Sequence, residues 1–263
     1  MDALETELDR ARDLDEAALA DAIETIGFEC TRCGACCKGY EPEDGEDGEE
    51  SAGDERGEEN PGDERDEESE GVEMDRGDGG DDGGDDDREP HTATVFPDEV
   101  RGLQEAGDYD WRDVARPMPY GLSEGDGGPE GETFEWALQT DSCGDCTFYT
   151  EAADGTGACQ VHADRPLICQ TYPFSVDLGG TSQPMGEAVD EAGMVRAHEC
   201  EGLGRDISRA AAEDLAAALK TRAIRELQEA ISVRDNYEPA ETEGVVVHDS
   251  EGAKRVDGRP VDE

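Results

Sequence analysis

The feature that most constrains this chain is a run of cysteines near its N-terminus, where four of the nine cysteines fall within eight residues. Cys30, Cys33 and Cys36 are each separated by two residues, so one tight turn can direct three sulfurs toward a common point. This spacing is typical of zinc knuckles and of cubane iron–sulfur sites. Cys37 follows directly, and because adjacent side chains usually point apart, we expect it to meet cysteines from elsewhere in the chain. The sequence therefore predicts a site for a soft metal.

The composition limits both the size of the core and the class of partner. Of the 263 residues, 34% are hydrophobic and 36% are charged, and the formal net charge is −50. Because binding to phosphates requires clustered Lys and Arg, we expect neither nucleic acid nor an anionic membrane surface as a partner. Lysine is rare (Lys38, Lys220 and Lys254) and acidic residues occur in every segment. These traits are typical of a halophilic protein whose surface is adapted to a high-salt cytosol, where salt screens self-repulsion.

The start of the chain and its cysteine usage predict a cytoplasmic protein. No basic and apolar leader follows Met1, and no apolar run approaches membrane-spanning length. In the cytoplasm a cysteine-rich pattern is more typical of metal binding or catalysis than of disulfides.

Four segments are expected. Residues 1–40 form a helical region over 4–26, ended by Gly27 and followed by the cysteine turn. Residues 41–90 form an acidic disordered insertion, because residues 41–89 hold 26 acidic residues against four arginines and almost nothing apolar. A calcium loop at Asp85, Asp86 and Asp87 is disfavoured, since the alternating oxygen ligands and the terminal Glu of an EF-hand are missing.

The remainder of the cysteine domain is expected over residues 91–237, and residues 238–263 form either a loose tail or a small hairpin pairing 245–247 with 254–256. Asp206 or Ser208 caps a C-terminal helix that packs on the first helix. Shorter elements are expected as a strand at 92–96, a helix at 97–106, a helical turn at 111–118 and a strand at 133–138. The fold class is thus a small irregular α+β domain, stabilised by metal and flanked by N- and C-terminal helices.

Five further cysteines are scattered through the second half of the chain, each in a recognisable local motif. They are Cys143 and Cys146, Cys159 of Cys159-x-Val161-His162, Cys169 of Arg165-Pro166-x2-Cys169-x2-Tyr172-Pro173-Phe174, and Cys200. Scattered single thiols of this kind are expected to converge on the first turn.

Together with Phe28-x-Cys30-x2-Cys33-Gly34-x-Cys36-Cys37, these motifs resemble the YkgJ-like cysteine-cluster (CxxCxxCC) family, a zinc- or iron-chelating domain often labelled an iron–sulfur oxidoreductase. The resemblance covers about residues 26–202. It implies eight ligand cysteines, namely Cys30, Cys33, Cys36, Cys37, Cys146, Cys159, Cys169 and Cys200. Two departures are Gln170, where the family usually has arginine, and Cys143, which is extra to the pattern.

Eight thiols divide into two four-cysteine sites or one larger cluster, and thiolates favour zinc or iron–sulfur centres over hard cations. We favour an iron–sulfur cluster, with [4Fe–4S] as the first candidate. The first turn is similar to a ferredoxin run whose fourth ligand comes from elsewhere, here Cys169 or Cys200. Zinc stays open, because zinc sites more often use pairs such as Cys143-x2-Cys146.

Cations and histidines near the cysteines have supporting roles in this interpretation. Arg32, Lys38 and Arg165 lie within a few residues of a cysteine and are expected to offset the negative charge of the centre from outside its ligands. His162 and His198 either replace a thiol or, as we favour, donate a hydrogen bond near the centre.

The first functional hypothesis is an iron–sulfur protein, an oxidoreductase if it is an enzyme, acting in electron transfer or in redox-dependent modification of another protein. The alternative is a non-enzymatic zinc module whose metals hold the fold together. Dithiol exchange at Cys143 and Cys146 is a weaker reading, because that motif lies in a loop. A radical-enzyme pattern fails at Tyr40, where a third cysteine is required. The redox partner and the substrate are not indicated.

Overall fold

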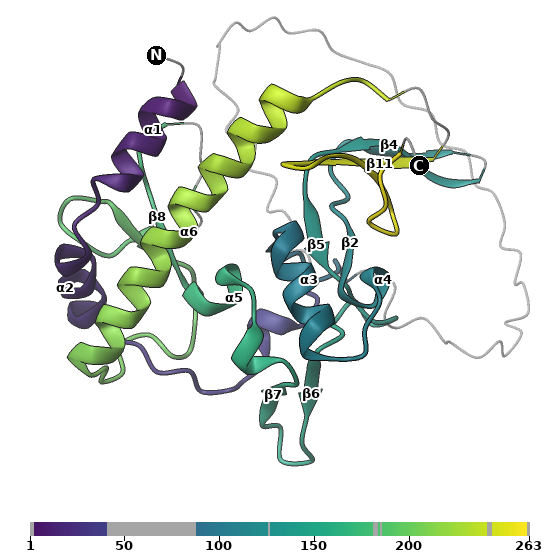
Figure 1. The fold of residues 1–263 in the computed structure, drawn as a ribbon. Helices are drawn as coiled ribbons and strands as arrows, with labels where there is room; N and C mark the ends of the chain where they lie inside the picture. Colours follow the sequence, from purple (N-terminus) through teal and green to yellow (C-terminus); the bar gives the residue numbers. More distant parts are fainter. Residues whose placement is uncertain are drawn as a thin grey trace, which may run out of the picture.

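The computed structural model describes residues 3–40, 88–125, 127–180, 184, 186–240 and 244–261. The acidic insertion predicted for residues 41–90 therefore lies almost wholly outside the described residues. The described chain is a mixed α+β fold with small sheets, two N-terminal helices and one long C-terminal helix (Figure 1).

The N-terminal region consists of α1 (Ala3–Arg12) and α2 (Glu16–Ile26). Asp15 begins the second helix, because its carboxylate accepts hydrogen bonds from the backbone amides of its first turn. Gly27 ends it with φ 74°, a left-handed conformation that glycine adopts without strain. The predicted end of the helical region at Gly27 is confirmed.

The C-terminal helix α6 (Arg209–Asn236) is the longest element and lies beside α1 and α2 (Figure 1). Ser208 is its cap, since the Ser208 hydroxyl accepts a hydrogen bond from the amide of Ala211 at 3.2 Å. Because α6 packs against both α1 and α2, the predicted packing of the terminal helices on one another is confirmed.

The first of two hydrophobic cores forms where these three helices meet a small antiparallel sheet. The sheet has the order β8–β10–β9, with β8 at Phe174–Val176, β9 at Glu187–Ala188 and β10 at Val195–Ala197. Leu19, Ile23 and Leu219 are each at most 2% exposed in this core. Full burial of such side chains stabilises the fold by about 1.5–3 kcal/mol each.

The second core is built on a three-stranded antiparallel sheet of order β1–β5–β2, with two helices against it. Its elements are β1 (Thr94–Val95), α3 (Pro97–Ala106), α4 (Trp111–Val114), β2 (Ala115–Pro117) and β5 (Trp136–Leu138). The rings of Trp111 and Trp136 meet edge to face with centroids 5.0 Å apart in this core.

A four-stranded sheet of order β12–β11–β4–β3 lies beside the second core, and Figure 1 shows it at the C-terminal end of the chain. Its strands are β3 (Leu122–Gly125), β4 (Gly128–Thr133), β11 (Val245–Asp249) and β12 (Gly252–Arg255). The predicted hairpin is confirmed, with Val246 opposite Arg255 and Val247 opposite Lys254. The hairpin also pairs in parallel with β4, which the sequence did not indicate.

The remaining elements are short and surround the cysteines. They are the 3₁₀ turns at Ala35–Cys37 and His162–Asp164, the hairpin of β6 (Tyr149–Glu151) with β7 (Gly157–Cys159), and α5 (Leu167–Thr171).

Two predicted elements differ in extent. The helical turn expected at 111–118 stops at Val114, because the chain then extends into β2 and pairs with β5. The strand expected at 133–138 is divided, because Phe134 and Glu135 turn out to solvent between β4 and β5. In both cases strand pairing with distant segments overrides the local pattern.

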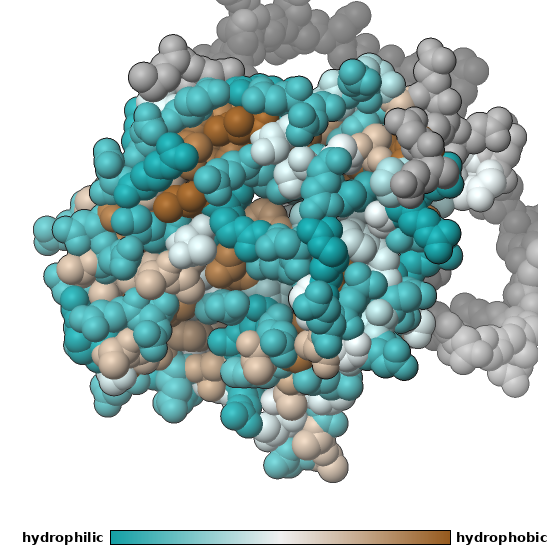
Figure 2. Space-filling view, in the orientation of Figure 1, coloured by the Kyte–Doolittle hydropathy of each residue, from teal (hydrophilic) through white to brown (hydrophobic). Residues whose placement is uncertain are grey.

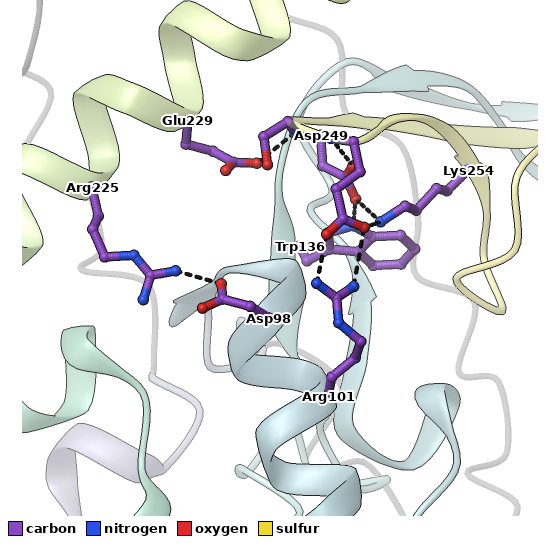
Figure 3. A network of polar contacts seen from close by, with 9 residues as sticks. Asp98, Arg101, Trp136, Arg225, Glu229, Asp249 and Lys254 are labelled. Carbon is purple, nitrogen blue, oxygen red and sulfur yellow. Dashed lines mark hydrogen bonds and ion pairs between the residues drawn. The ribbon is translucent and has the colours of Figure 1, made fainter.

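A buried ion network fastens the C-terminal hairpin to the second core (Figure 3). Lys254 is 5% exposed, and its amine lies 2.8 Å from a carboxylate oxygen of Asp249 and 2.6 Å from one of Glu251. The indole of Trp136 donates to Asp249 at 2.9 Å. These contacts bring residues about 113 positions apart into one buried cluster.

The outer surface is mostly hydrophilic on the face shown in Figure 2, with hydrophobic residues visible mainly along α6. No helix among the described residues is both long and apolar enough to cross a membrane.

Candidate metal centre

The cysteine turn is held at its first end by the loop that carries Cys200. Phe28 and Leu203 form an antiparallel bridge, and the amide of Glu29 donates to the carbonyl of Gly202 at 3.0 Å. The ring of Phe28 also packs edge to face on Phe174 of the first core, with centroids 5.8 Å apart. Cys30 is thereby brought near Cys200, which lies 170 positions later in the sequence.

The other end of the turn is held by the segment that carries Cys146 and Cys159. The amide of Cys146 donates to the carbonyl of Cys37 at 2.7 Å, and the β6–β7 hairpin places Cys159 opposite Tyr149. The amide of Gly157 donates to the carbonyl of Arg32 at 2.7 Å. The hairpin therefore lies directly on the cysteine turn.

Gly34 makes this close approach possible. Its φ is 80°, and a Cβ atom at this position would lie 2.1 Å from the hydroxyl oxygen of Tyr149. A larger residue would be strained in its backbone and would also displace the Tyr149 ring. The glycine of the motif is thus required by the packing of the hairpin on the turn.

Cys169 is positioned by α5, and a buried carboxylate fixes the start of that helix. Glu99 of α3 accepts hydrogen bonds from the amide of Leu167 at 2.9 Å and from the amide of Phe96 at 3.0 Å. Burial raises the pKa of Glu99, and the two amides partly oppose that rise. Nothing in the local sequence marks Glu99 or Tyr149 as supports of the cysteines, because both act through contacts with distant segments.

The thiols fall into two neighbourhoods, the first of which we call the inner group. It is packed on the second hydrophobic core and consists of Cys37, Cys146, Cys159 and Cys169. Burial raises the pKa of Cys146 to about 11 and raises the pKa of Cys169 further, and neighbouring thiols add to both shifts. Ionising several of these thiols together is unfavourable unless a cation offsets their charge.

The second neighbourhood, the outer group, consists of Cys30, Cys33, Cys36 and Cys200. Burial raises the pKa of the Cys200 thiol, and Cys33, Cys36 and Cys30 raise it further. Burial raises the pKa of the Tyr172 hydroxyl, and the thiols of Cys200, Cys36 and Cys33 raise it further. Cys30 is exposed, and the other three are partly exposed.

Cys36 and Cys37 join the two groups. Their sulfur atoms lie 3.9 Å apart, and Cys36 interacts electrostatically with thiols of both groups. The hydrogen bond with Cys37 lowers the pKa of Cys36 to about 7 and raises that of Cys37. Of this adjacent pair, Cys36 is therefore the thiol that ionises more readily.

The three cations proposed to offset the charge of the centre lie in different settings. Arg165 lowers the pKa of Cys36 and also opposes the rise at Cys159 and Cys169. Lys38 is paired with the carboxylate of Glu151 at 2.5 Å and lies 5.4 Å from the Tyr149 ring centroid. Arg32 contributes its carbonyl to the hairpin contact and lies near enough to lower the pKa of His162.

The two histidines and the ninth cysteine have other contacts. His162 Nε2 lies 2.5 Å from a guanidinium nitrogen of Arg165, and the His198 ring meets Tyr172 edge to face with centroids 6.0 Å apart. Cys143 is exposed, and its amide donates to Asp141 at 2.9 Å.

The donor set fits a soft metal. Four of the thiols (Cys37, Cys146, Cys159 and Cys169) lie in or against the second hydrophobic core, and thiolate is the preferred ligand of zinc and of iron–sulfur centres. The hydroxyl of Thr31, within the turn, is buried and has no hydrogen-bond partner among the described residues, so it is available to donate to a thiolate. Within the same residues, no three Cys, His, Asp or Glu side chains are grouped closely enough to hold one ion. Ligation therefore requires rotation of cysteine side chains about χ1.

Comparison with known proteins gives one match. Residues 108–201 match the family model CxxCxxCC, described as "Putative zinc- or iron-chelating domain". This segment contains Cys143, Cys146, Cys159, Cys169 and Cys200, and it begins after the acidic insertion that separates it from the first turn. No curated protein and no solved structure matches the chain. Over this segment the chain is similar to the CxxCxxCC family of zinc- or iron-chelating domains.

Proposed function

We propose that this protein is an iron–sulfur protein that transfers electrons or supports redox-dependent modification of another protein. The observation that carries the proposal is the gathering of thiols around Cys36 and Cys37, where buried thiols raise one another's pKa values. Such a group is stable in its ionised form only when a bound cation offsets the charge.

The position of Cys200 supports iron–sulfur over zinc. Cys30, Cys33 and Cys36 follow the spacing of a ferredoxin run, which takes its fourth ligand from a distant part of the chain. Cys200 lies beside these three thiols and interacts electrostatically with each of them. We therefore propose Cys200 as the fourth ligand that the ferredoxin-like spacing calls for.

The residues of this chain would hold and shield such a centre. An iron–sulfur cluster held by these cysteines would supply one-electron redox chemistry. Arg165 offsets part of the thiolate charge, and Phe28 and Phe174 cover the turn on the side of the first core. The exposed Cys30 marks the side from which a partner can approach.

A structural zinc module is the second candidate. It is favoured by the inner group, whose four cysteines are part of the second hydrophobic core. A structural zinc site contributes directly to folding, as a small core often requires. In this case the metal would hold the two cores together and no electron transfer would occur.

The working environment that we propose is a high-salt cytosol. With a net charge of −50, the folded chain repels itself strongly at low ionic strength, and this repulsion is screened over about 3 Å at 1 M salt. The same charge opposes binding to nucleic acid and to anionic membranes.

Anaerobic purification followed by iron, acid-labile sulfide and zinc analysis tests the proposal. We expect a coloured protein that contains iron and sulfide and bleaches reversibly on reduction. Colourless protein with about two zinc ions per chain would contradict the proposal and leave the structural zinc module. Cys143→Ser is the matched control and should retain the colour, because Cys143 lies outside both thiol groups.

A further inference from the structure

We infer that a cavity at the junction of α3, α5 and α6 binds a small molecule that carries an oxyanion, either a carboxylate or a phosphate group. The cavity has a volume of about 330 Å³, and no cysteine is among the described residues that line it. Sites for small molecules usually measure about 300–1,000 Å³, so this one is large enough for a metabolite and too small for a nucleic acid. The inference does not depend on which metal the thiols hold.

Two guanidinium groups from different elements line the cavity. Arg165 directly follows the 3₁₀ turn at His162–Asp164, and Arg225 lies on α6. A guanidinium presents a planar fork of N–H donors that matches the oxygens of a carboxylate or a phosphate. Because the chain as a whole carries a charge of −50 and repels anions, an anion is held only where cations are brought together in this way.

Arg165 is available to a ligand, because it forms no ion pair with a carboxylate of the described residues. Its guanidinium contacts the ring of His162 instead, with Nε2 at 2.5 Å. Arg209, by comparison, is paired with three carboxylates. The carbonyl of Arg165 accepts a hydrogen bond from the side-chain amide of Gln170 at 2.7 Å, which fixes the backbone. Gln170 also lines the cavity, and the second N–H of its amide can donate to the same ligand.

Arg225 is held in a fixed orientation at the cavity. Its guanidinium lies 4.5 Å from the centroid of the Phe96 ring, and this stacking restricts the plane of the fork. Arg225 also reaches from α6 to the carboxylate of Asp98 on α3 (Figure 3). Because the Asp98 side chain is exposed, this ion pair is weak, and a ligand can compete for the same guanidinium.

Two carboxylates also line the cavity, but neither is paired directly with the two arginines. Glu99 accepts the amide of Leu167 at one carboxylate oxygen and the amide of Phe96 at the other, so its charge is partly offset by the backbone. Asp164 is exposed. The donors of Arg165 are therefore left for a ligand.

Gly102 keeps one wall of the cavity open. It lies in the interior of α3, and nothing is found within 4 Å of a Cβ atom placed there. Glycine inside a helix is less favourable than alanine, and here neither close packing nor a left-handed backbone requires it. We attribute the glycine to access to the cavity.

Equilibrium dialysis of the full-length protein against labelled inorganic phosphate and, separately, labelled succinate tests the inference. Both are measured in concentrated KCl, which screens the net charge. We expect one equivalent of at least one of the two anions per chain, and the anion that binds identifies the oxyanion group. Arg165→Gln and Arg225→Gln should each weaken binding by about tenfold or more, because each removes a charge-assisted hydrogen bond. Arg112→Gln is the matched control and should bind as the wild type does, since Arg112 does not line the cavity.

Gly102→Leu provides a second measurement that does not remove a charge. Leucine leaves both guanidinium groups in place and favours a helix, so the thermal midpoint should not fall while binding weakens. Absence of binding of both anions to the wild-type protein would overturn the inference. Binding that is unchanged in the two arginine variants and in Gly102→Leu would overturn it as well, because the anion would then be held elsewhere.

Discussion

The backbone amide of Cys146 donates a hydrogen bond to the carbonyl of Cys37 at 2.7 Å, and so connects two segments that lie on opposite sides of the acidic insertion. Cys37 lies a few residues before the point at which the described chain reaches the insertion. Tyr40 and Glu89 form an antiparallel bridge there, with amide-to-carbonyl distances of 3.0 and 2.8 Å.

Replacement of residues 42–87 by a four-residue Gly-Ser turn should leave the fold and its metal content intact. The bridge between Tyr40 and Glu89 already holds the two ends together, and Arg88 adds a bond to the carbonyl of Gly39 at 2.5 Å and one to Asp145 at 3.3 Å. The measurements are the thermal midpoint and the metal content per chain. As a control, Arg88→Ala in the shortened protein should lower the midpoint, and loss of the fold in the shortened protein alone would contradict the prediction.

Substitution of Lys254 should be strongly destabilising. Lys254→Ala leaves the Asp249 carboxylate, which is 2% exposed, without its cation, and breaking a buried ion pair in this way typically costs about 3–5 kcal/mol. Arg101→Gln is the matched control, because it removes an exposed partner of Glu251 in the same network (Figure 3) and should cost under about 1 kcal/mol. Urea unfolding of both variants gives the two free energies, and equal values would contradict the prediction.

Gly34→Ala should destabilise the protein more than Gly155→Ala. Both glycines have nearly equal left-handed φ angles, 80° and 83°, so both variants incur a backbone cost of roughly 1–2 kcal/mol. Only at Gly34 does an added Cβ meet another residue, the Tyr149 ring, whereas at Gly155 nothing lies within 4 Å. Thermal unfolding of the two variants isolates the clash from the backbone term. A Gly34→Ala midpoint no lower than that of Gly155→Ala would show that the ring moves aside without cost.

Stability should fall as the pH is lowered from about 6.5 to about 4, in part because of His91. Burial, together with the charge of the nearby Arg116, lowers the pKa of His91 from 6.5 to about 4. Over this interval the unfolded chain binds a proton at His91 that the folded chain does not, so the free energy of unfolding decreases with decreasing pH. The contribution is at most about 3 kcal/mol.

The His91→Gln variant separates this effect from the titration of the carboxylates and thiols. Its free energy of unfolding, measured by urea at pH 7 and at pH 4.5, should change less than that of the wild type. Parallel pH profiles for the two proteins would exclude His91 as a contributor.

Much of the helical framework was predictable because the signals that define helix ends are local. Asp15, Gly27, Pro97 and Ser208 each act on backbone groups within four residues, and all four boundaries are found in the structure. The hairpin at 245–255 was predictable for the same reason, since its strands are joined by a short turn.

The pairing of β11 with β4 was not predictable. Val246 lies opposite Glu132, more than 100 residues earlier, and no local periodicity records such a register. The strand expected at 133–138 is divided for the same reason, because its two ends belong to β4 and β5, which pair with distant strands in different sheets.

The candidate site shows the same limit. The spacing of the cysteines predicted a metal site, and the family resemblance then implied which of them bind the metal. Which thiols lie together depends on how the β6–β7 hairpin and the Cys200 loop fold onto the turn, which the spacing does not determine. Glu99 and Tyr149 support the site through contacts with Leu167 and Gly34, and these contacts exist only in the folded chain.

The length of α6 determines how this protein comes apart. With 28 residues at about 1.5 Å rise each, the helix extends roughly 42 Å. Its middle is buried in the first core through Leu219, while Glu229 near its C-terminal end accepts a hydrogen bond from the amide of Ser250 at 2.7 Å, beside the C-terminal hairpin. Because one continuous helix contacts both parts of the fold, unfolding at either end of α6 removes contacts at the other end. We therefore expect the two cores to unfold together, as a single cooperative unit.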